Sequence, residues 1–185
     1  KVGSYTVLTT SLNYASFGQL FLKRLMDICG GLVGCIFTGI ITIFVGPAIY
    51  LASPGPIFFS QERVGKNGKK FKMYKFRSMC VDSEKEGARL AMKGDSRVTP
   101  IGKVLRNIHF DELPQLLNII IGDMSLVGPR PERPEIAAQY TKDIPEFPYR
   151  LKVKAGLTGY AQVYGKYNTT PYDKLKLDLT YIENY

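Results

Sequence analysis

The stretch from Asn107 to Arg133, NIHFDELPQLLNIIIGDMSLVGPRPER, predicts a short amphipathic helix that two adjacent carboxylates precede. Apolar residues recur at helical spacing over Leu113–Ile121, and Pro114 falls in the first turn, where its missing N–H costs no hydrogen bond. Asp111 then takes the N-cap position and Glu112 follows it. A carboxylate there is held ionised by the helix dipole, which suits either a plain cap or a nucleophile. For an isolated Asp-Glu pair, the cap is the commoner role.

A proline-flanked arginine follows this helix. Gly122 is expected to end the helix, and the next loop contains Gly128-Pro129-Arg130-Pro131. The two prolines fix φ on both sides of the arginine and reduce its backbone freedom. A stiffly mounted guanidinium suits bidentate contact with a phosphate. For these four residues alone, a surface turn with an incidental charge is the simpler interpretation.

The positive charge of the chain is concentrated in one region. The 185 residues include 25 Lys and Arg against 16 Asp and Glu, a formal net charge of +9. Between Gln61 and Arg106 there are thirteen basic and five acidic residues. Such a patch attracts nucleic acid, anionic lipid headgroups or a phosphorylated substrate, and its sign does not discriminate among them. The length predicts a single domain with one modest core.

An uncharged, apolar stretch precedes the basic region. Residues Ile28–Ala52 are long enough to cross a bilayer, for which about 20 apolar residues suffice. One spanning helix is the plain interpretation. Two features favour a re-entrant helix that enters and leaves by the same face: basic residues flank both ends, and Gly46-Pro47 interrupts the helix near its C-terminal end. The residues alone leave the two topologies equally open.

A β-hairpin is expected after the apolar stretch. Two strands, Ile57–Val64 and Lys70–Met79, would be joined around Asn67-Gly68, a favoured hairpin dipeptide. Lys75 and Arg77 would share a face of the second strand, because side chains alternate with a period of two. The two cations would then suit a pyrophosphate, although a solvated hairpin face explains them as well.

The other segments predict helices and loops. Short helices are expected over Ile101–Ile108, which carries Arg106, and over Pro134–Thr141. Asp82–Lys93 predicts an exposed charged helix or loop. Lys154–Asn168 is rich in glycine and tyrosine and predicts either a loop around a ligand or a glycine-bent hairpin.

Several function classes lack their motifs. The three cysteines show no C-x-x-C spacing, which is typical of a reduced, cytoplasmic setting, and the single histidine, His109, cannot form a metal cluster. No two aspartates are two residues apart, as metal-dependent nucleotide-sugar glycosyltransferases would require. The phosphate-binding pattern G-x-x-x-x-G-K-[ST] is absent.

Three sequence blocks together carry a resemblance to a known family. They are QERVGKNGKKFKMYKFRSM at Gln61–Met79, FDELPQLLNIIIGDMSLVGPRP at Phe110–Pro131 and VKAGLTGYAQVYGKYN at Val153–Asn168. In this order they closely resemble the bacterial sugar transferase family, the monotopic phosphoglycosyl transferases or polyprenyl glycosylphosphotransferases. The likeness runs from about Phe21 to the last residue.

The resemblance implies an α+β fold with three parts. Residues 1–20 would be a tail or the end of a larger N-terminal region, 21–52 a Pro-kinked re-entrant membrane helix, and 53–185 a compact, mainly helical catalytic domain with a short β-hairpin. The break would lie at Gly46-Pro47, where many relatives have Ser-Pro. The family also implies a place at the bacterial inner membrane, with the site on the cytoplasmic face.

The resemblance further implies transfer of a sugar 1-phosphate from a UDP-sugar to a polyprenyl phosphate, with release of UMP. Asp111 would attack the β-phosphate and form an aspartyl phosphosugar, with Glu112 as its catalytic neighbour and Mg²⁺ held near one or both carboxylates. The donor phosphates would meet four cations: Lys75, Arg77, Arg106 and Arg130. Asp178 matches a family position without an assigned role. The transferred sugar and the oligomeric state stay open, and no nucleic acid partner is expected.

The main alternative is a non-enzymatic, membrane-anchored basic module that binds anionic lipid or nucleic acid. It accounts for the basic patch and the apolar stretch. It does not account for Asp111, Glu112 and Arg130 lying in the family's motifs.

Overall fold

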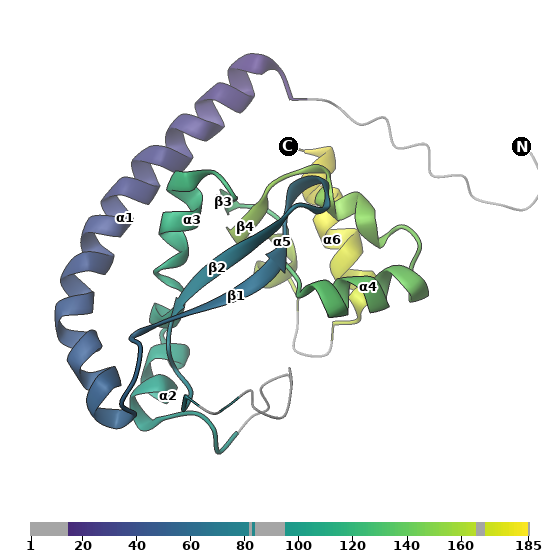
Figure 1. The fold of residues 1–185 in the computed structure, drawn as a ribbon. Helices are drawn as coiled ribbons and strands as arrows, with labels where there is room; N and C mark the ends of the chain where they lie inside the picture. Colours follow the sequence, from purple (N-terminus) through teal and green to yellow (C-terminus); the bar gives the residue numbers. More distant parts are fainter. Residues whose placement is uncertain (1–14, 82, 84–94, 166–168, 185) are drawn as a thin grey trace, which may run out of the picture.

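The computed structural model describes residues 15–81, 83, 95–165 and 169–184 (Figure 1). The described chain is α+β and mainly helical, as predicted. Its helices are α1 (Phe17–Ala52), α2 (Pro100–Asn107), α3 (Gln115–Ile121), α4 (Pro134–Asp143), α5 (Tyr160–Val163) and α6 (Pro171–Glu183). Its strands are β1 (Phe58–Val64), β2 (Lys70–Phe76), β3 (Met124–Val127) and β4 (Ala155–Thr158), and its 3-10 segments are η1 (Lys66–Gly68), η2 (Phe110–Glu112) and η3 (Phe147–Lys152). The helices predicted over Ile101–Ile108 and Pro134–Thr141 are confirmed as α2 and α4, whereas the predicted charged segment Asp82–Lys93 lies outside the described residues except for Ser83.

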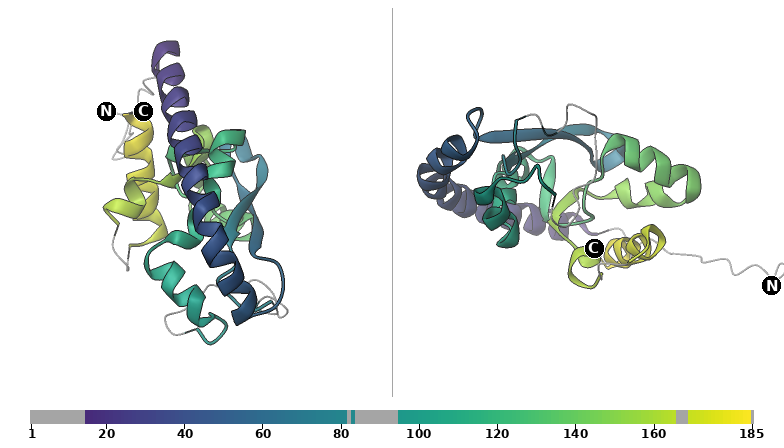
Figure 2. Two further views of the ribbon diagram at one scale, coloured as in Figure 1. Left: turned by 90° about the vertical axis from the view of Figure 1, so that its left-hand side faces the viewer. Right: turned by 90° about the horizontal axis from the view of Figure 1, so that it is seen from below.

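Helix α1 lies along one side of the molecule, with α3 beside it and α4 and α6 on the far side of the hairpin (Figures 1 and 2). Polar side chains near its N-terminal end anchor it. Arg24 donates to two carbonyls at the C-terminal end of α3, at 2.7 and 2.8 Å, and satisfies groups that have no partner within that helix. The buried Asp27 accepts from the Ser125 hydroxyl at 3.0 Å and the Leu126 N–H at 2.9 Å.

The C-terminal half of α1 packs on the same domain. Ile49 joins Phe76 and Leu105 in a buried cluster. The opposite face of α1 is apolar and exposed, with several large side chains at least half accessible: Val33, Ile36, Ile40, Ile43, Phe44 and Leu51. By length and composition, α1 is long and apolar enough to cross a membrane.

The break predicted in this helix is not seen. Helix α1 begins at Phe17, before the predicted start at residue 21, and continues through Gly46 and Pro47 to Ala52. The helix is bowed in Figure 1. The hydroxyls of Thr38 and Thr42 each donate to the carbonyl four residues earlier at 2.7 Å, a contact that often bends helices. The re-entrant topology therefore stays a prediction.

The predicted hairpin is confirmed. Strands β1 and β2 pair antiparallel from Phe58 opposite Phe76 to Val64 opposite Lys70. Asn67 and Gly68 in the connection have φ of 57° and 76°, the left-handed region that Asn and Gly adopt most readily. One side of β2 joins α3 and β3 in the main core, which contains Phe71, Met73, Leu116, Ile119 and Met124.

A second, parallel sheet was not predicted. Strand β3 pairs with β4, with Met124 opposite Ala155 and Val127 opposite Thr158. The glycine-bent hairpin suggested for Lys154–Asn168 is therefore wrong: β4 is followed by the short helix α5. The backbones approach so closely after β3 that a Cβ on Gly156 would collide with Gly128, which explains the glycine there. This contact ties the proline-flanked loop to β4.

Candidate active site

Asp111 and Glu112 lie in η2, one turn of 3-10 helix between α2 and α3. His109 just before it has a φ of 59°, which turns the chain sharply. Helix α3 begins only at Gln115, with Pro114 at its N-cap, so the N-cap role predicted for Asp111 is wrong. The extra turn separates the two carboxylates from the first turn of α3, and their contacts lie instead with the hairpin and the proline-flanked loop.

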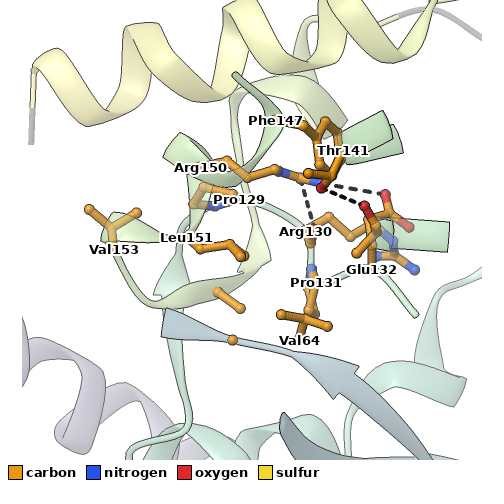
Figure 3. Close-up of a pocket in the computed structure, with 13 residues that line it drawn as sticks. Val64, Pro129, Arg130, Pro131, Glu132, Thr141, Phe147, Arg150, Leu151 and Val153 are labelled. Carbon is orange, nitrogen blue, oxygen red and sulfur yellow. Dashed lines mark hydrogen bonds and ion pairs between the residues drawn. The ribbon is translucent and has the colours of Figure 1, made fainter. Parts of the chain in front are cut away.

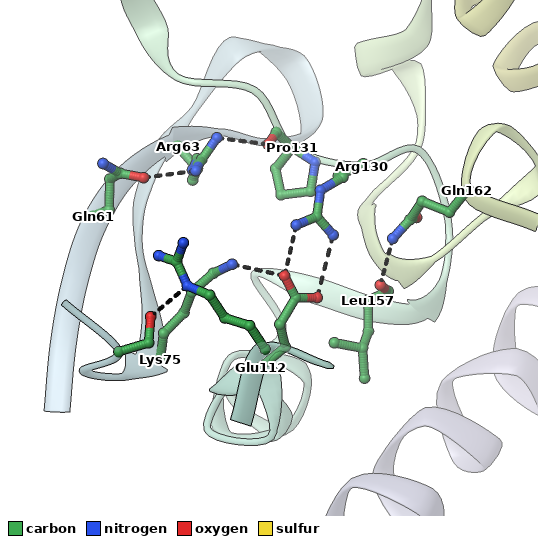
Figure 4. Close-up of polar contacts among 10 residues, drawn as sticks. Gln61, Arg63, Lys75, Glu112, Arg130, Pro131, Leu157 and Gln162 are labelled. Carbon is green, nitrogen blue, oxygen red and sulfur yellow. Dashed lines mark hydrogen bonds and ion pairs between the residues drawn. The ribbon is translucent and has the colours of Figure 1, made fainter. Parts of the chain in front are cut away.

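Glu112 is held by two cations (Figure 4). Lys75 of β2 donates to Glu112 Oε1 at 2.7 Å, and the Arg130 fork donates to Oε1 at 2.6 Å and to Oε2 at 3.2 Å. Burial alone would raise the pKa of Glu112, but the hydrogen bonds and charge of Arg130, together with Lys75, lower it to about 2. Glu112 is thus ionised, and both of its oxygens are engaged.

Asp111 is in a different situation. It is 7 % exposed and makes no hydrogen bond or ion pair with any residue that the structure describes. Burial raises the pKa of Asp111, while the nearby charges of Lys75 and Arg106 oppose the rise and that of Glu112 adds to it. A carboxylate without a partner, surrounded by cations, is available to a ligand.

The two other predicted cations differ in their contacts. Arg106 donates from Nε to the Ser78 hydroxyl at 2.8 Å and reaches the site from α2. Arg77 follows β2, is 6 % exposed, and donates from Nη2 to the Ser53 carbonyl in the turn after α1. Arg77 binds the backbone through Nη2, and its Nε and Nη1 have no hydrogen-bond partner among the described residues. The pyrophosphate clamp of Lys75 and Arg77 stays a prediction.

Two cavities meet at Asp111. The hairpin cavity has a volume of about 450 Å³ and includes residues of β1, β2 and the start of α4. The β4 cavity has a volume of about 770 Å³ and includes residues of η2, β4 and α5. Both volumes are in the range of small-molecule sites. Four residues line both cavities: Lys75, Arg106, Asp111 and Arg130.

The residues present suit a magnesium ion that a substrate would help to bind. No group of three His, Cys, Asp or Glu side chains that could hold a metal occurs among the described residues. Mg²⁺ is, however, commonly bound by one or two carboxylates together with substrate phosphates. The carboxylate of Asp111 is uncommitted, whereas Glu112 is occupied by Lys75 and Arg130. Asp111 is accordingly the better ligand of the predicted pair.

Three predicted residues lie away from this site. Asp178 is buried in α6 and forms an ion pair with Arg150 at 2.7 Å. Gly46 and Pro47 lie within α1, and neither lines the two cavities. The predictions also omitted Ser78, which holds Arg106. Ser78 was predicted to lie within the strand Lys70–Met79, whereas β2 ends at Phe76, and a serine there carries no signal of such a contact.

Comparisons with known proteins agree with the motifs. The model of the family "Bacterial sugar transferase" matches residues 18–185. The chain is 44 % identical over 168 residues, 89 % of its length, to a UDP-N-acetylgalactosamine-undecaprenyl-phosphate N-acetylgalactosaminephosphotransferase of Aeromonas hydrophila. It is 40 % identical, over 98 % of its length, to a galactosyl transferase of Streptococcus agalactiae. It is 39 % identical, over 90 % of its length, to a UDP-glucose:undecaprenyl-phosphate glucose-1-phosphate transferase of Klebsiella pneumoniae.

These alignments cover only part of each relative. They include 40 %, 42 % and 37 % of the Aeromonas, Streptococcus and Klebsiella proteins, so the chain spans about two fifths of their lengths. The family match nevertheless includes the hairpin, both carboxylates, the proline-flanked arginine and α6. The chain belongs to the bacterial sugar transferase family.

Proposed function

We propose that the chain transfers a sugar 1-phosphate from a UDP-sugar to a polyprenyl phosphate, releasing UMP. The observation that carries the proposal is Asp111, an uncommitted carboxylate where two cavities meet beside Lys75, Arg106 and Arg130. Two cavities on one carboxylate suit two substrates that react with it in turn. The names of the relatives support the substrate classes, because two of them act on a UDP-sugar and undecaprenyl phosphate.

In the first step, an Asp111 carboxylate oxygen attacks the β-phosphorus of the donor. A bond forms between that oxygen and phosphorus, and the bond from phosphorus to the oxygen bridging the two phosphates breaks. UMP leaves with the bridging oxygen and its electron pair. The aspartyl phosphosugar that remains is a covalent intermediate of the kind that carboxylate nucleophiles form.

In the second step, a phosphate oxygen of the lipid attacks the same phosphorus. The polyprenyl diphosphosugar forms, and Asp111 is released as a carboxylate. Phosphoryl transfer depends on positioning and on neutralising charge at the phosphate oxygens. Lys75, Arg106 and Arg130 supply positive charge in both steps because they line both cavities. Bound magnesium, held by Asp111, would add charge neutralisation at the phosphates.

Glu112 has a different role in this proposal. Its oxygens are engaged by Lys75 and Arg130, and its low pKa makes it a poor proton carrier near neutral pH. Glu112 therefore orients the two cations. The transferred sugar is left open, because the three relatives are named for N-acetylgalactosamine, galactose and glucose.

We further propose that α1 holds the domain on the cytoplasmic face of the bacterial inner membrane without spanning it. Arg24 and Asp27 bind the domain near one end of α1, and Ile49 packs on it near the other. A spanning α1 would carry this domain into the hydrocarbon. The exposed apolar face of α1, with exposed Val104 on α2 and Leu117 on α3, two helices that contact α1, instead suits burial at one membrane surface.

The proposed chemistry is tested with donor labelled in its β-phosphate. Without acceptor, the protein should retain label, and peptide mapping should place it on Asp111. Undecaprenyl phosphate should then remove the label and yield labelled lipid, and a panel of UDP-sugars would identify the donor through UMP release. A protein that binds the lipid and never takes up label would favour the non-enzymatic module.

The topology is tested with single cysteines at Lys23 and Lys66, in a background where Cys29, Cys35 and Cys80 are replaced. Both should resist an impermeant thiol reagent in intact spheroplasts and react once the cells are opened. Labelling of only one position in intact spheroplasts would show that α1 spans the membrane.

A further inference from the structure

The backbone around Arg130 is held at four successive carbonyls. The Pro129 and Glu132 carbonyls accept from the backbone N–H groups of Gly156 at 2.9 Å and Val64 at 3.0 Å. The Pro131 carbonyl accepts from the Arg63 side chain at 3.2 Å, and the Arg130 carbonyl accepts from Arg150 Nη2 at 2.8 Å. The prolines themselves have no N–H to donate. The direction of the Arg130 fork thus depends on donors outside its own loop.

Arg150 is the most deeply buried of these side-chain donors. It comes from η3 and is 5 % exposed. Figure 3 shows its side chain beside Arg130 and Glu132. Its Nη2 lies 2.7 Å from Asp178 Oδ2, on α6, and its Nη1 lies 3.7 Å from Glu132 Oε1. Asp178 is 1 % exposed. The Arg150 guanidinium therefore links Asp178 on α6 to the backbone carbonyl of Arg130. The side chain of Arg130 in turn binds Glu112.

Direct contact of Arg150 with substrate is excluded by space. The cavity that Arg150 lines has a volume of about 30 Å³. That is room for about one water molecule and not for a nucleotide or a lipid phosphate. Asp178 lines neither the hairpin cavity nor the β4 cavity. Arg150 instead contacts the Arg130 loop, at the Arg130 carbonyl and at Glu132, and both of those residues line the hairpin cavity.

A purely stabilising role explains the pair poorly. Replacing a buried ion pair by apolar residues of similar volume is often neutral or stabilising, because two charges must be desolvated to form the pair. An Arg150 that only filled space would need no carbonyl at hydrogen-bond distance. The hydrogen bond from Arg150 to the Arg130 carbonyl connects the ion pair to a residue of the candidate active site.

We propose that Arg150 and Asp178 are positioning residues that hold the Arg130 backbone so that its guanidinium meets Glu112 and the substrate phosphate. This rests on the proposed function. Asp178 fixes the Arg150 guanidinium, Arg150 fixes the Arg130 carbonyl, and the prolines transmit that position to the side chain. Small displacements of a phosphate-binding group cost large factors in rate, about 100-fold for 1 Å.

The test uses two double variants in which both charges are removed together, so that neither residue of the pair is left as an unpaired buried charge. One is apolar, Arg150→Met with Asp178→Leu, and the other is polar and uncharged, Arg150→Gln with Asp178→Asn. Both are purified in nanodiscs, checked for folding by thermal melting, and assayed for the rate at which β-phosphate label appears on the protein. Whichever double variant is folded should label about 10- to 100-fold more slowly than wild type.

Coupling to Arg130 separates positioning from a general effect. In an Arg130→Lys background, which already lacks the fork, the same double substitution should slow labelling by less than twofold, because effects within one network are not additive. The matched control is Asp173→Asn with Lys176→Met, an exposed ion pair on α6 with a separation of 3.8 Å. The asparagine keeps an acceptor for Thr170, and labelling should equal that of wild type.

Each outcome bears on a separate claim. The positioning role alone would be overturned if the folded double variants label at the wild-type rate. It would also be overturned if the double substitution slows labelling equally in the wild-type and Arg130→Lys backgrounds. Wild-type protein that takes up no label would overturn the proposed function, and this inference would fall with it.

Discussion

Asp111 and Asp178 are both buried aspartates whose pKa is raised by burial, yet their surroundings differ. Asp111 has no partner among the described residues and faces two cavities. Asp178 lines neither of these cavities and is paired with Arg150 at 2.7 Å. Burial and the direction of the pKa shift are therefore common to the two aspartates. Asp111 differs from Asp178 in lining two cavities and in having an uncommitted carboxylate.

The largest expected difference between the two regions is in covalent labelling. Asp111→Asn preserves shape and removes the anionic nucleophile, so β-phosphate label should be absent and turnover should fall by orders of magnitude. Asp178→Asn, assayed below its melting temperature, should still take up label slowly. Radiolabel on gel-purified protein measures both. Equal labelling of wild type and Asp111→Asn would end the nucleophile assignment.

The same two variants should move stability in opposite directions. Asp178→Asn removes the carboxylate nearest to the buried Arg150 and leaves only Glu132, at 3.7 Å, so it should lower the free energy of unfolding by about 3 to 5 kcal/mol. Asp111→Asn should raise it at pH 7, because the folded state no longer holds an ionised carboxylate that burial disfavours. The gain should shrink as pH falls through the raised folded pKa and vanish below the unfolded value of about 3.9. Thermal melts from pH 3 to 8 would show both trends, and a destabilised Asp111→Asn at pH 7 would contradict this account.

Glu112 provides the opposite pH dependence within the same turn. Its folded pKa is about 2, below the unfolded value of about 4.3, so its ionised form stabilises the fold by about 3 kcal/mol above pH 5. This contribution is lost as pH falls through both values. Glu112→Gln should therefore destabilise the protein at pH 7 and have little effect near pH 2. A pH-independent difference would show that the charges of Lys75 and Arg130 do not act through Glu112.

The smallest expected effect comes from Arg130, which connects the two regions through its side chain and its carbonyl. Arg130→Lys keeps the charge and loses the bidentate fork, so the activation free energy should rise by about 1 to 3 kcal/mol. Steady-state UMP release would measure this change. An Arg130→Lys protein with wild-type kinetics would assign Arg130 to the surface turn that the sequence also allowed.

Local patterns predicted the elements that depend on neighbouring residues. Asn67 and Gly68 predicted the hairpin because few residues adopt positive φ readily. Apolar periodicity predicted α3, and Gly122 does end it, with a φ of 104°. The N-cap position for Asp111 was wrong because a 3-10 turn that periodicity does not encode separates Asp111 from α3.

By itself, the sequence determined the family and the α+β class, because spacing along the chain encodes motifs and short elements. It also singled out Asp111, Glu112 and Arg130 as candidate site residues. Tertiary structure alone decided which strands pair and which side chains contact one another. Pairing of β3 with β4 and the reach of Arg150 to Arg130 and Asp178 join segments that are distant in the chain. It also decided that Glu112 is engaged and Asp111 is not, because a carboxylate's pKa and availability depend on burial and on charges brought near by folding.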